Sequence, residues 1–309
     1  MTHSKNLKYS IIVFFTKLFL HGFALLSLKN SHRIGGFFGW LISITPNRHH
    51  FVTTTNVKIC FPEMGEQQQQ QLIKDSLIET GKTATEISAM WCWSKEKLYS
   101  SIKNIKGEEF LQQALKDNKG VILACPHLGN WELLGQYLAD KYPTTCMYQK
   151  PKISQLDSII RNGRQRFGVK LVPTDSQGIR SMLKSIKNNE VVCILPDQEP
   201  SEGNGVFAPF FGIQAYSMIL ISRFAKKTGA TVLSIYGNRL KNGEGYEIVF
   251  KPLDKIAEGS LEESVSYLNS EMEKCIADIP EQYQWSYKRF RRQPEVKDKR
   301  ITGKDFYNP

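Results

Sequence analysis

The sequence predicts an α/β protein in which a mostly parallel β-sheet is flanked by helices on both faces. Three observations support this fold class: short apolar runs recur along the chain, segments with helical periodicity alternate with them, and no segment rich in Pro, Gly or Ser divides the middle of the chain. Strands that alternate with helices form parallel sheets whose two faces the helices cover. Ligands of such sheets collect at the carboxyl ends of the strands.

The helices and strands are predicted from the spacing of apolar residues and from turn-forming residues between them. The run VILAC at 121–125 comes directly after the turn-forming segment DNKG and is typical of a buried strand, whereas 67–93 has a glutamine-rich start and apolar positions at helical spacing. Read in this way, the chain has expected helices at 67–93, 108–116, 131–140, 154–167, 178–187, 217–228 and 261–277, and expected strands at 121–125, 144–148, 191–195, 231–236 and 246–250.

An apolar stretch at 11–28 precedes these elements. As a helix it would be about 27 Å long, close to the thickness of the hydrocarbon core of a bilayer. Lys17 and His21 interrupt the stretch but share one helical face, so a spanning helix and an in-plane anchor both remain open. The residues that follow, KNS at 29–31, do not form a small-x-small cleavage site, which indicates an uncleaved anchor.

A second apolar stretch at 34–44 is too short to span a bilayer and suits either an interfacial helix or a buried core helix. We therefore expect a membrane anchor at 1–30, one folded domain at 31–295 with an interfacial N-terminal segment, and a polar C-terminal tail at 296–309.

The formal net charge of +11 predicts an anionic partner, such as nucleic acid, acidic headgroups, a phosphorylated substrate or an acidic carrier protein. The basic residues are dispersed apart from a local cluster at Lys288, Arg289, Arg291 and Arg292. Neither a zinc-finger spacing nor an aromatic RNA-binding signature is present, which disfavours nucleic acid. The six cysteines are scattered without a Cys-x-x-Cys pair, so the sequence favours a reducing compartment and suggests neither a disulfide framework nor a metal site.

The segment HLGNWE at 127–132 carries the candidate chemistry. His127 follows a predicted strand, Asn130 can cap the next helix, and Glu132 would occupy its first turn. With His127 in the turn before the helix, the chain can fold back and let the carboxylate reach the imidazole. Such a pair would activate a substrate hydroxyl. The alternative is a satisfied histidine at a strand end and a surface glutamate.

HLGNWE resembles the His-x4-acid motif of the lysophospholipid acyltransferase superfamily, in the form found in the late, lauroyl- or myristoyl-type acyltransferases of lipid A biosynthesis. Three further blocks are similar to that family in the same order, namely IIRNGRQRFG, LPDQEPSEGNGVFAPFFG and PEQYQWSYKRFRRQP. The resemblance therefore covers residues 10–295. It implies a glycerol-3-phosphate acyltransferase-like fold in a membrane protein of a Gram-negative bacterium.

The resemblance also implies a reaction. A fatty acyl chain would pass from acyl carrier protein to a hydroxyl of a lipid A precursor at the cytoplasmic side of the inner membrane. His127 would be the general base, oriented by Glu132, with direct attack on the thioester and no covalent acyl-enzyme. The expected partners are acyl carrier protein, the glycolipid and the membrane, but not nucleic acid; beyond the carrier-protein thioester, no cofactor and no metal are expected.

Other residues of these blocks become candidates for substrate binding. Guanidinium groups suit phosphates or a developing oxyanion because they bind bidentately and stay charged. The candidates are Arg164, which matches the family's Gly-Arg position, its neighbour Arg166, Asp197 after a predicted strand, Asn130, and Lys288 and Arg289 as headgroup or carrier-protein contacts. For the acyl chain, the candidates are Phe207, Phe210 and Phe211, for which core packing is equally compatible with the sequence.

Three alternatives remain open. A cysteine hydrolase would use Cys125, two residues before His127, although Pro126 and the apolar surroundings argue against a reactive thiolate. A lipid-binding protein on the same fold would be non-catalytic. An acyltransferase with a different acceptor would modify a lysophospholipid or another glycolipid, with acyl-CoA or acyl carrier protein as the donor. Chain length, acylated position and oligomeric state are not encoded in any local motif.

Overall fold

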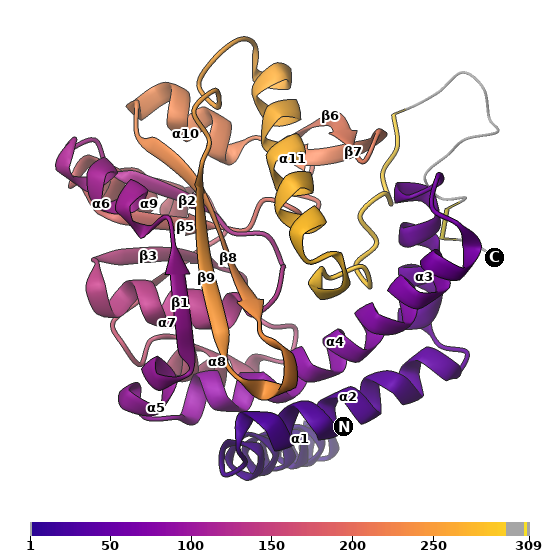
Figure 1. Ribbon diagram of the computed structural model, residues 1–309. Coiled ribbons are helices and arrows are strands. Elements are labelled where there is room, and N and C mark those ends of the chain that lie inside the picture. Colours follow the sequence, from indigo (N-terminus) through magenta and orange to yellow (C-terminus); the bar gives the residue numbers. More distant parts are fainter. Residues whose placement is uncertain (1, 295–305, 308–309) are drawn as a thin grey trace.

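The computed structural model describes residues 2–294 and 306–307, with side chains from Tyr9 onward. Its centre is a seven-stranded sheet in the order β1-β9-β8-β2-β5-β3-β4, covered by helices on both faces (Figure 1). The strands are β1 (Ile102–Lys106), β2 (Val121–Ala124), β3 (Thr144–Tyr148), β4 (Lys170–Pro173), β5 (Val191–Ile194), β8 (Thr231–Arg239) and β9 (Tyr246–Pro252). A separate hairpin consists of β6 (Gly205–Phe210) and β7 (Ile213–Met218).

The helices, including short 3-10 turns, are α1 (Thr2–Ala24), α2 (Leu28–Ile44), α3 (Arg48–Cys60), α4 (Glu66–Cys92), α5 (Lys95–Ser100), α6 (Glu108–Lys116), α7 (Trp131–Lys141), η1 (Ser154–Leu156), α8 (Asp157–Arg164), α9 (Ser176–Lys187), α10 (Leu220–Thr228), η2 (Lys241–Gly243), α11 (Leu261–Asp278) and η3 (Pro280–Gln282). Every neighbouring pair of strands in the large sheet is parallel except β8 and β9. The predicted α/β class with a mostly parallel sheet is thus confirmed.

Four strands are not predicted from the sequence. β1 and β4 form the two edges of the large sheet, where a strand has one neighbour and lacks the continuous apolar run of a central strand. β6 and β7 pair only with each other. Because β7 takes residues up to Met218, the helix expected at 217–228 begins at Leu220.

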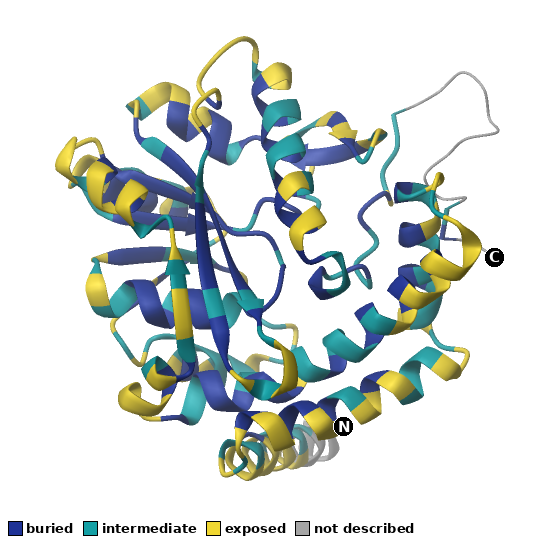
Figure 2. Cartoon of the chain, in the orientation of Figure 1, coloured by how far each residue is buried: buried dark blue, intermediate teal, exposed yellow. Residues whose placement is uncertain are grey.

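Two hydrophobic clusters fill the space between sheet and helices, and side chains of one strand alternate between them. In β2, Ile122 and Ala124 pack on the side of α9, α10 and α11, whereas Val121 and Leu123 pack on the side of α6 and α7. The central strands are therefore buried on both faces (Figure 2). This burial fixes the carboxyl ends of β2 and β5 side by side.

Helices α1, α2 and α4 lie beside the sheet layers (Figure 1). α2 approaches α4 closely because glycines face each other: a Cβ at Gly39 would lie 2.3 Å from the carbonyl oxygen of Leu77, and one at Gly81 would lie 2.1 Å from that of Gly35. The opposite side of α2 exposes Phe37 and other large apolar side chains. The stretch at 34–44 thus has one buried and one exposed side. Among the described residues, no helix is long and apolar enough to cross a bilayer.

A buried carboxylate ties these helices to the sheet. Glu86 of α4 accepts hydrogen bonds from Arg239 at 2.7 and 2.6 Å and from the Tyr246 hydroxyl at 2.8 Å, and it also contacts His32 of α2. Burial would raise the pKa of Glu86, but the charge of Arg239 and the hydrogen bonds from His32 and Arg239 outweigh burial and lower the pKa to about 2. The carboxylate is therefore held ionised inside the protein.

Of the tail predicted at 296–309, only residues 306 and 307 are among those described. Tyr307 is buried, and its hydroxyl accepts the backbone N–H of Phe290 at 3.1 Å and donates to Oδ1 of Asn56 at 2.5 Å. This part of the tail packs onto the folded domain.

Candidate active site

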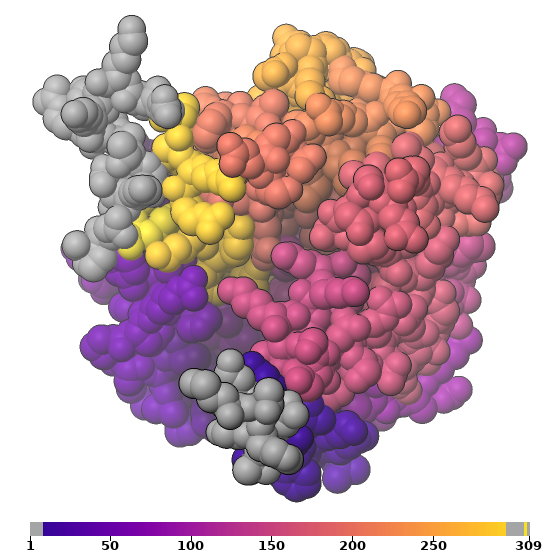
Figure 3. Space-filling view, turned by 180° about the vertical axis from the view of Figure 1, so that it is seen from behind, coloured from indigo at the N-terminus to yellow at the C-terminus, as the bar shows by residue number. Residues whose placement is uncertain are grey.

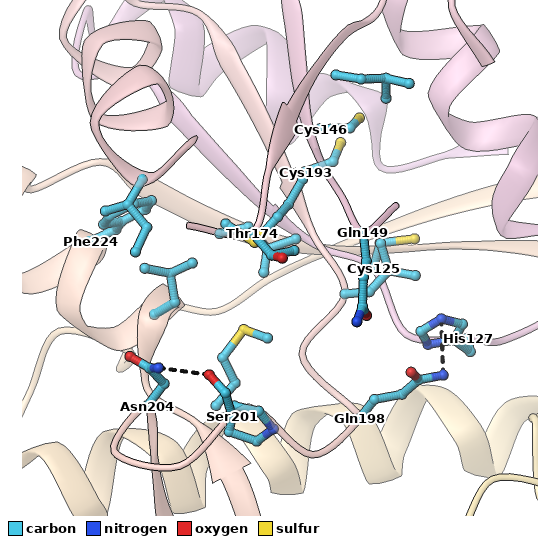
Figure 4. A pocket seen from close by; sticks show the side chains of 18 of the residues that line it. Cys125, His127, Cys146, Gln149, Thr174, Cys193, Gln198, Ser201, Asn204 and Phe224 are labelled. Carbon is cyan, nitrogen blue, oxygen red and sulfur yellow. Dashed lines mark hydrogen bonds between the residues drawn. The ribbon is translucent and has the colours of Figure 1, made fainter. Parts of the chain in front are cut away.

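A cavity of about 930 Å³ lies at the carboxyl ends of β2, β3 and β5. Figure 3 shows a hollow on this face, between the yellow C-terminal segment and the pink middle of the chain. His127 enters the cavity after β2, and Gln198 enters it after β5 (Figure 4). The cavity is thus where a ligand of a parallel sheet is expected.

Backbone contacts clamp the turn that carries His127. Gly129 has a φ of 62° and donates its N–H to the carbonyl of Gln282 at 3.0 Å, and Asn130 donates its N–H to the carbonyl of Gly237 at 2.7 Å. A Cβ at Gly129 would lie 1.9 Å from the Gly237 oxygen, so only glycine fits this conformation. The turn therefore holds His127 in a defined place between strand and helix, as the sequence predicts.

Asp197 is the carboxylate that holds the imidazole. Its Oδ1 lies 2.9 Å from Nδ1 of His127, and its Oδ2 accepts the backbone N–H of His127 at 2.9 Å. Burial would raise the pKa of the Asp197 carboxyl, but the charge and hydrogen bonds of His127 outweigh burial and hold the pKa below its ordinary value. An ionised Asp197 fixes the proton of the neutral imidazole on Nδ1, which leaves Nε2 to face the cavity.

Glu132 does not take the place beside His127 that the sequence predicts for it. Its carboxylate accepts hydrogen bonds from Nε of Arg164, at 3.1 and 3.0 Å, and also contacts the NH2 group of Arg164. It accepts a further hydrogen bond from Nε1 of Trp91 at 2.9 Å. The reason is that α8 and α4 supply two donors to the first turn of α7, where Glu132 lies. The ion pair, in turn, raises the pKa of Arg164 against the lowering effect of burial.

Arg164, a predicted substrate-binding residue, lies at the cavity. Its side chain is 33% exposed, lines the cavity and lies with its guanidinium carbon 5.7 Å from the centre of the Tyr148 ring. Arg166 is exposed, its guanidinium carbon lies 5.3 Å from the centre of the Phe167 ring, and it is not among the described residues that line the cavity. The structure therefore separates the two arginines that the sequence grouped together.

Nε2 of His127 has a neighbour that sequence reasoning missed. The amide nitrogen of Gln198 lies 3.3 Å from Nε2 and donates to Oε1 of Gln284 at 3.0 Å. Gln284 donates its own backbone N–H to the carbonyl of His127 at 3.1 Å. The only signal for Gln198 in the sequence was its position, because it directly follows Asp197 at the end of a predicted strand.

Asn130 and Arg289 are buried and engaged by protein groups, which corrects their expected exposure to substrate. Asn130 accepts the N–H of Leu133 as the cap of α7, at 3.0 Å, and donates to Glu86 at 3.1 Å. Arg289 donates to the Tyr216 carbonyl and the Ser217 hydroxyl of β7, at 2.8 and 2.6 Å. The C-terminal segment packs against the hairpin and buries this guanidinium there. Lys288 lies 5.3 Å from the centre of the Tyr307 ring.

The three phenylalanines proposed for the acyl chain lie elsewhere. Phe210 is buried among Phe211, Tyr283 and Phe290, and Phe207 is partly exposed beside Tyr216. None of the three is among the described residues that line the cavity. Its apolar wall instead includes Met147, Leu171, Ile179, Leu183, Leu220 and Phe224. β6 and β7 form a hairpin of their own, which places Phe210 and Phe211 against aromatic rings of the C-terminal segment.

Basic side chains also line the cavity, namely Arg223, Lys227, Arg291 and Arg292. Arg291 binds the buried carboxylate of Glu199 at 3.1 and 2.9 Å, and that carboxylate also accepts the backbone N–H of Arg292 at 2.8 Å. The wall of the cavity therefore combines apolar and positively charged surface.

Cys125 is a poor candidate for a nucleophile. It is buried, and burial together with the charge of Asp197 raises the pKa of its thiol well above the ordinary value. A thiolate is the reactive form of cysteine. The site therefore favours histidine-based chemistry over a cysteine hydrolase.

Comparison with known proteins identifies the family of the chain. A model of the bacterial lipid A biosynthesis acyltransferase family matches residues 1–292. The chain is 26% identical to the lipid A biosynthesis lauroyltransferase of Escherichia coli (strain K12) over 271 residues, which cover 85% of this chain and 86% of that protein. It is 22% identical to the lipid A biosynthesis myristoyltransferase of the same organism over 279 residues, 89% of this chain and 84% of that protein. A lipid A biosynthesis acyltransferase of Haemophilus influenzae is 28% identical over 245 residues, 79% of this chain and 76% of that protein.

Proposed function

Because this chain belongs to the bacterial lipid A biosynthesis acyltransferase family, we propose that it transfers a fatty acyl chain from acyl carrier protein to a hydroxyl of a lipid A precursor, with His127 as general base. The family supports acyl transfer in lipid A biosynthesis. The observation that carries the mechanism is the Asp197–His127 pair, at 2.9 Å, in which the second ring nitrogen of His127, Nε2, is left for a substrate in the cavity that His127 lines.

The reaction proceeds by direct attack. Nδ1–H of His127 donates to Asp197, so Nε2 carries the lone pair and accepts the proton of the acceptor hydroxyl. The hydroxyl oxygen attacks the carbonyl carbon of the thioester, and the tetrahedral intermediate collapses as the carbon–sulfur bond breaks. The leaving thiolate takes the proton from the imidazolium, which Asp197 has stabilised in the meantime. An ester and a free carrier thiol result, and His127 returns to its starting form.

Glu132 acts through Arg164 in this proposal. The carboxylate of Glu132, whose side chain is 9% exposed, holds the guanidinium at the cavity wall. A guanidinium fixed in this way can bind a phosphate of the glycolipid or the oxyanion of the intermediate. Glu132 is then a positioning residue for Arg164, and Asp197 has that role for His127.

The cavity walls suit the two substrates. The apolar residues between α9 and α10 would receive the acyl chain, because burial of methylene groups is favourable by about 0.8 kcal/mol each. The basic residues Arg223, Lys227, Arg291 and Arg292 would attract an acidic carrier protein or a phosphorylated glycolipid.

Exposed apolar side chains support association with a membrane, which we propose to be the inner membrane at its cytoplasmic face. Among the described residues, eleven of the thirteen large hydrophobic side chains that are exposed lie between Ile11 and Ile44, and they include Phe14, Phe37 and Phe38. These belong to α1, α2 and their connection, which also line a shallow apolar groove. Helices with such a side lie in the plane of a membrane and bury it at the headgroup boundary.

The test is expression of this protein in a bacterium that lacks its own late acyltransferases, followed by mass spectrometry of the lipid A. The proposal predicts lipid A that is heavier by one fatty acyl chain with the native protein and unchanged lipid A with His127→Ala. Unchanged lipid A with the native, membrane-associated protein would contradict the assigned acceptor, and an acylated lysophospholipid in the same extract would identify another.

A further inference from the structure

The side chain of Gln198 lies beside the base and lines the same cavity. Its amide nitrogen is 3.3 Å from Nε2 of His127 and 3.0 Å from Oε1 of Gln284 (Figure 4 shows the contact with His127). A primary amide has two N–H donors. One is used by Gln284, and the other is available to the nitrogen that the mechanism assigns as the base.

The orientation of this amide follows from its surroundings. Nδ1 of His127 donates to Asp197, so Nε2 is an acceptor and requires a donor opposite it. The carbonyl oxygen of Gln284 likewise requires a donor, which places the NH2 group of Gln198 between the two acceptors. Gln284 is itself tied to the backbone of His127 at 3.1 Å, so the three residues form a closed ring.

We propose that Gln198 is a gate on the base: its amide occupies Nε2 of His127 until the acceptor hydroxyl displaces it, and it thereby keeps water from attacking the bound thioester. This inference rests on the proposed function, because it concerns how the same base chooses between the acceptor and water. Gln198 is a specificity-determining residue in this account, and transfer itself does not require it.

The strength of the contact fits a gate. At 3.3 Å, the Gln198–His127 contact is longer than the 2.7–3.2 Å of ordinary hydrogen bonds, so an acceptor hydroxyl held by the cavity can replace it. The contact with Gln284, at 3.0 Å, has ordinary length and retains the displaced side chain nearby. A lone water molecule lacks the binding energy of a glycolipid and competes poorly for Nε2.

The chemical step that the gate suppresses is hydrolysis. With Nε2 uncovered, a water molecule gives its proton to His127 and attacks the thioester carbonyl carbon. The carbon–sulfur bond breaks, the thiolate takes the proton back, and a free fatty acid is released in place of an ester. The products of transfer and of hydrolysis therefore report how the base is used.

The experiment measures both products by mass spectrometry, with the full-length protein in detergent micelles, acyl carrier protein thioesters of twelve to sixteen carbons, and a lipid A precursor present or absent. Gln198→Ala and Gln198→Asn remove or shorten the amide, and Gln284→Ala removes the group that orients it. Each is expected to raise the ratio of hydrolysis to transfer about two- to threefold, as the loss of one hydrogen bond at the low end of net strength allows. Gln149→Ala, in an exposed glutamine that also lines the cavity, should leave the ratio unchanged.

Far-UV circular dichroism and the thermal midpoint establish that the variants are folded. An unchanged ratio in the folded variants at Gln198, or an equal loss of both products, would overturn the gate. Addition of His127→Ala to Gln198→Ala should abolish the extra hydrolysis; if that hydrolysis persists, Nε2 is not its base and the gate is wrong. Full transfer by the single variant His127→Ala would instead overturn the proposed function, so the two failures are distinguishable.

Discussion

Both carboxylate oxygens of Asp197 are hydrogen-bonded to His127. Oδ1 lies 2.9 Å from Nδ1 of the ring, and Oδ2 lies 2.9 Å from the backbone nitrogen. The two contacts fix the ring and the chain that carries it at once. Since Asp197 follows β5 and His127 follows β2, the parallel pairing of these strands brings the two residues together.

Replacement of Asp197 by Asn should lower kcat about a thousandfold with little effect on KM. An amide can donate to Nδ1 and would then place the ring proton on Nε2, which removes the base. The measurement is steady-state transfer from acyl carrier protein to the glycolipid. Asp175→Asn is the matched control, because Asp175 also lines the cavity but caps α9, a task that Asn performs equally well. Equal rates for the two variants would refute the role of Asp197.

Arg164→Ala should reduce kcat/KM at least tenfold, because the cavity loses a fixed guanidinium and the Glu132 carboxylate loses its ion partner. Arg164→Lys should recover only part of the activity, since lysine keeps the charge but loses the planar fork. Arg166→Ala, in the exposed arginine two residues away, is the control and should behave like the native enzyme. If the two alanine variants had the same kcat/KM, Arg164 would be a surface residue without a function in catalysis.

Glu86→Gln should lower the free energy of unfolding at pH 7 by about 3 kcal/mol, from the difference between the ordinary pKa of the carboxyl and its value of about 2 in the fold. The folded pKa lies below the unfolded one, so this stabilisation is present above about pH 5 and is lost as the pH falls toward 2. Urea unfolding at several pH values should therefore show the two proteins converge in acid. The exposed Glu109→Gln is the control, and a constant difference down to pH 3 would contradict the prediction.

Phe37→Ser combined with Phe38→Ser should weaken binding to anionic phospholipid vesicles about thirtyfold, if each ring contributes roughly 1 kcal/mol by partial burial in the membrane. Both rings are exposed, at 54% and 53%. Vesicle flotation gives the bound fraction. Phe110→Ser removes an exposed ring of α6 as a control, and equal binding by all three proteins would exclude α2 from the membrane contact.

Local signals in the sequence were sufficient for the turn at 127–132. The apolar run before His127, the capping residue Asn130 and the glycine at 129 each act within a few residues, and the structure confirms strand, turn and helix. The partner of His127 could not be found in this way, because Asp197 lies 70 residues further along the chain. Its position depends on the order of the strands, which no local pattern encodes.

The same limit explains the misplaced binding residues. Arg289 stands in a basic cluster that predicts a surface, but its donors are used by β7, a strand that was not predicted. Phe210 was a candidate for the acyl chain because aromatic residues and glycines gather in its block, whereas packing against Tyr283 and Phe290 decides its place. In both cases the missing information was the hairpin β6–β7.

The most direct test of the account is acyl transfer by His127→Ala, measured in single turnover with purified, folded protein and a lipid A precursor, together with the affinity for that glycolipid. The account predicts a loss of at least a thousandfold in the rate of transfer, with glycolipid affinity within a few-fold of the native value, since Nε2 acts on the proton and not in binding. A rate within tenfold of the native enzyme would contradict it.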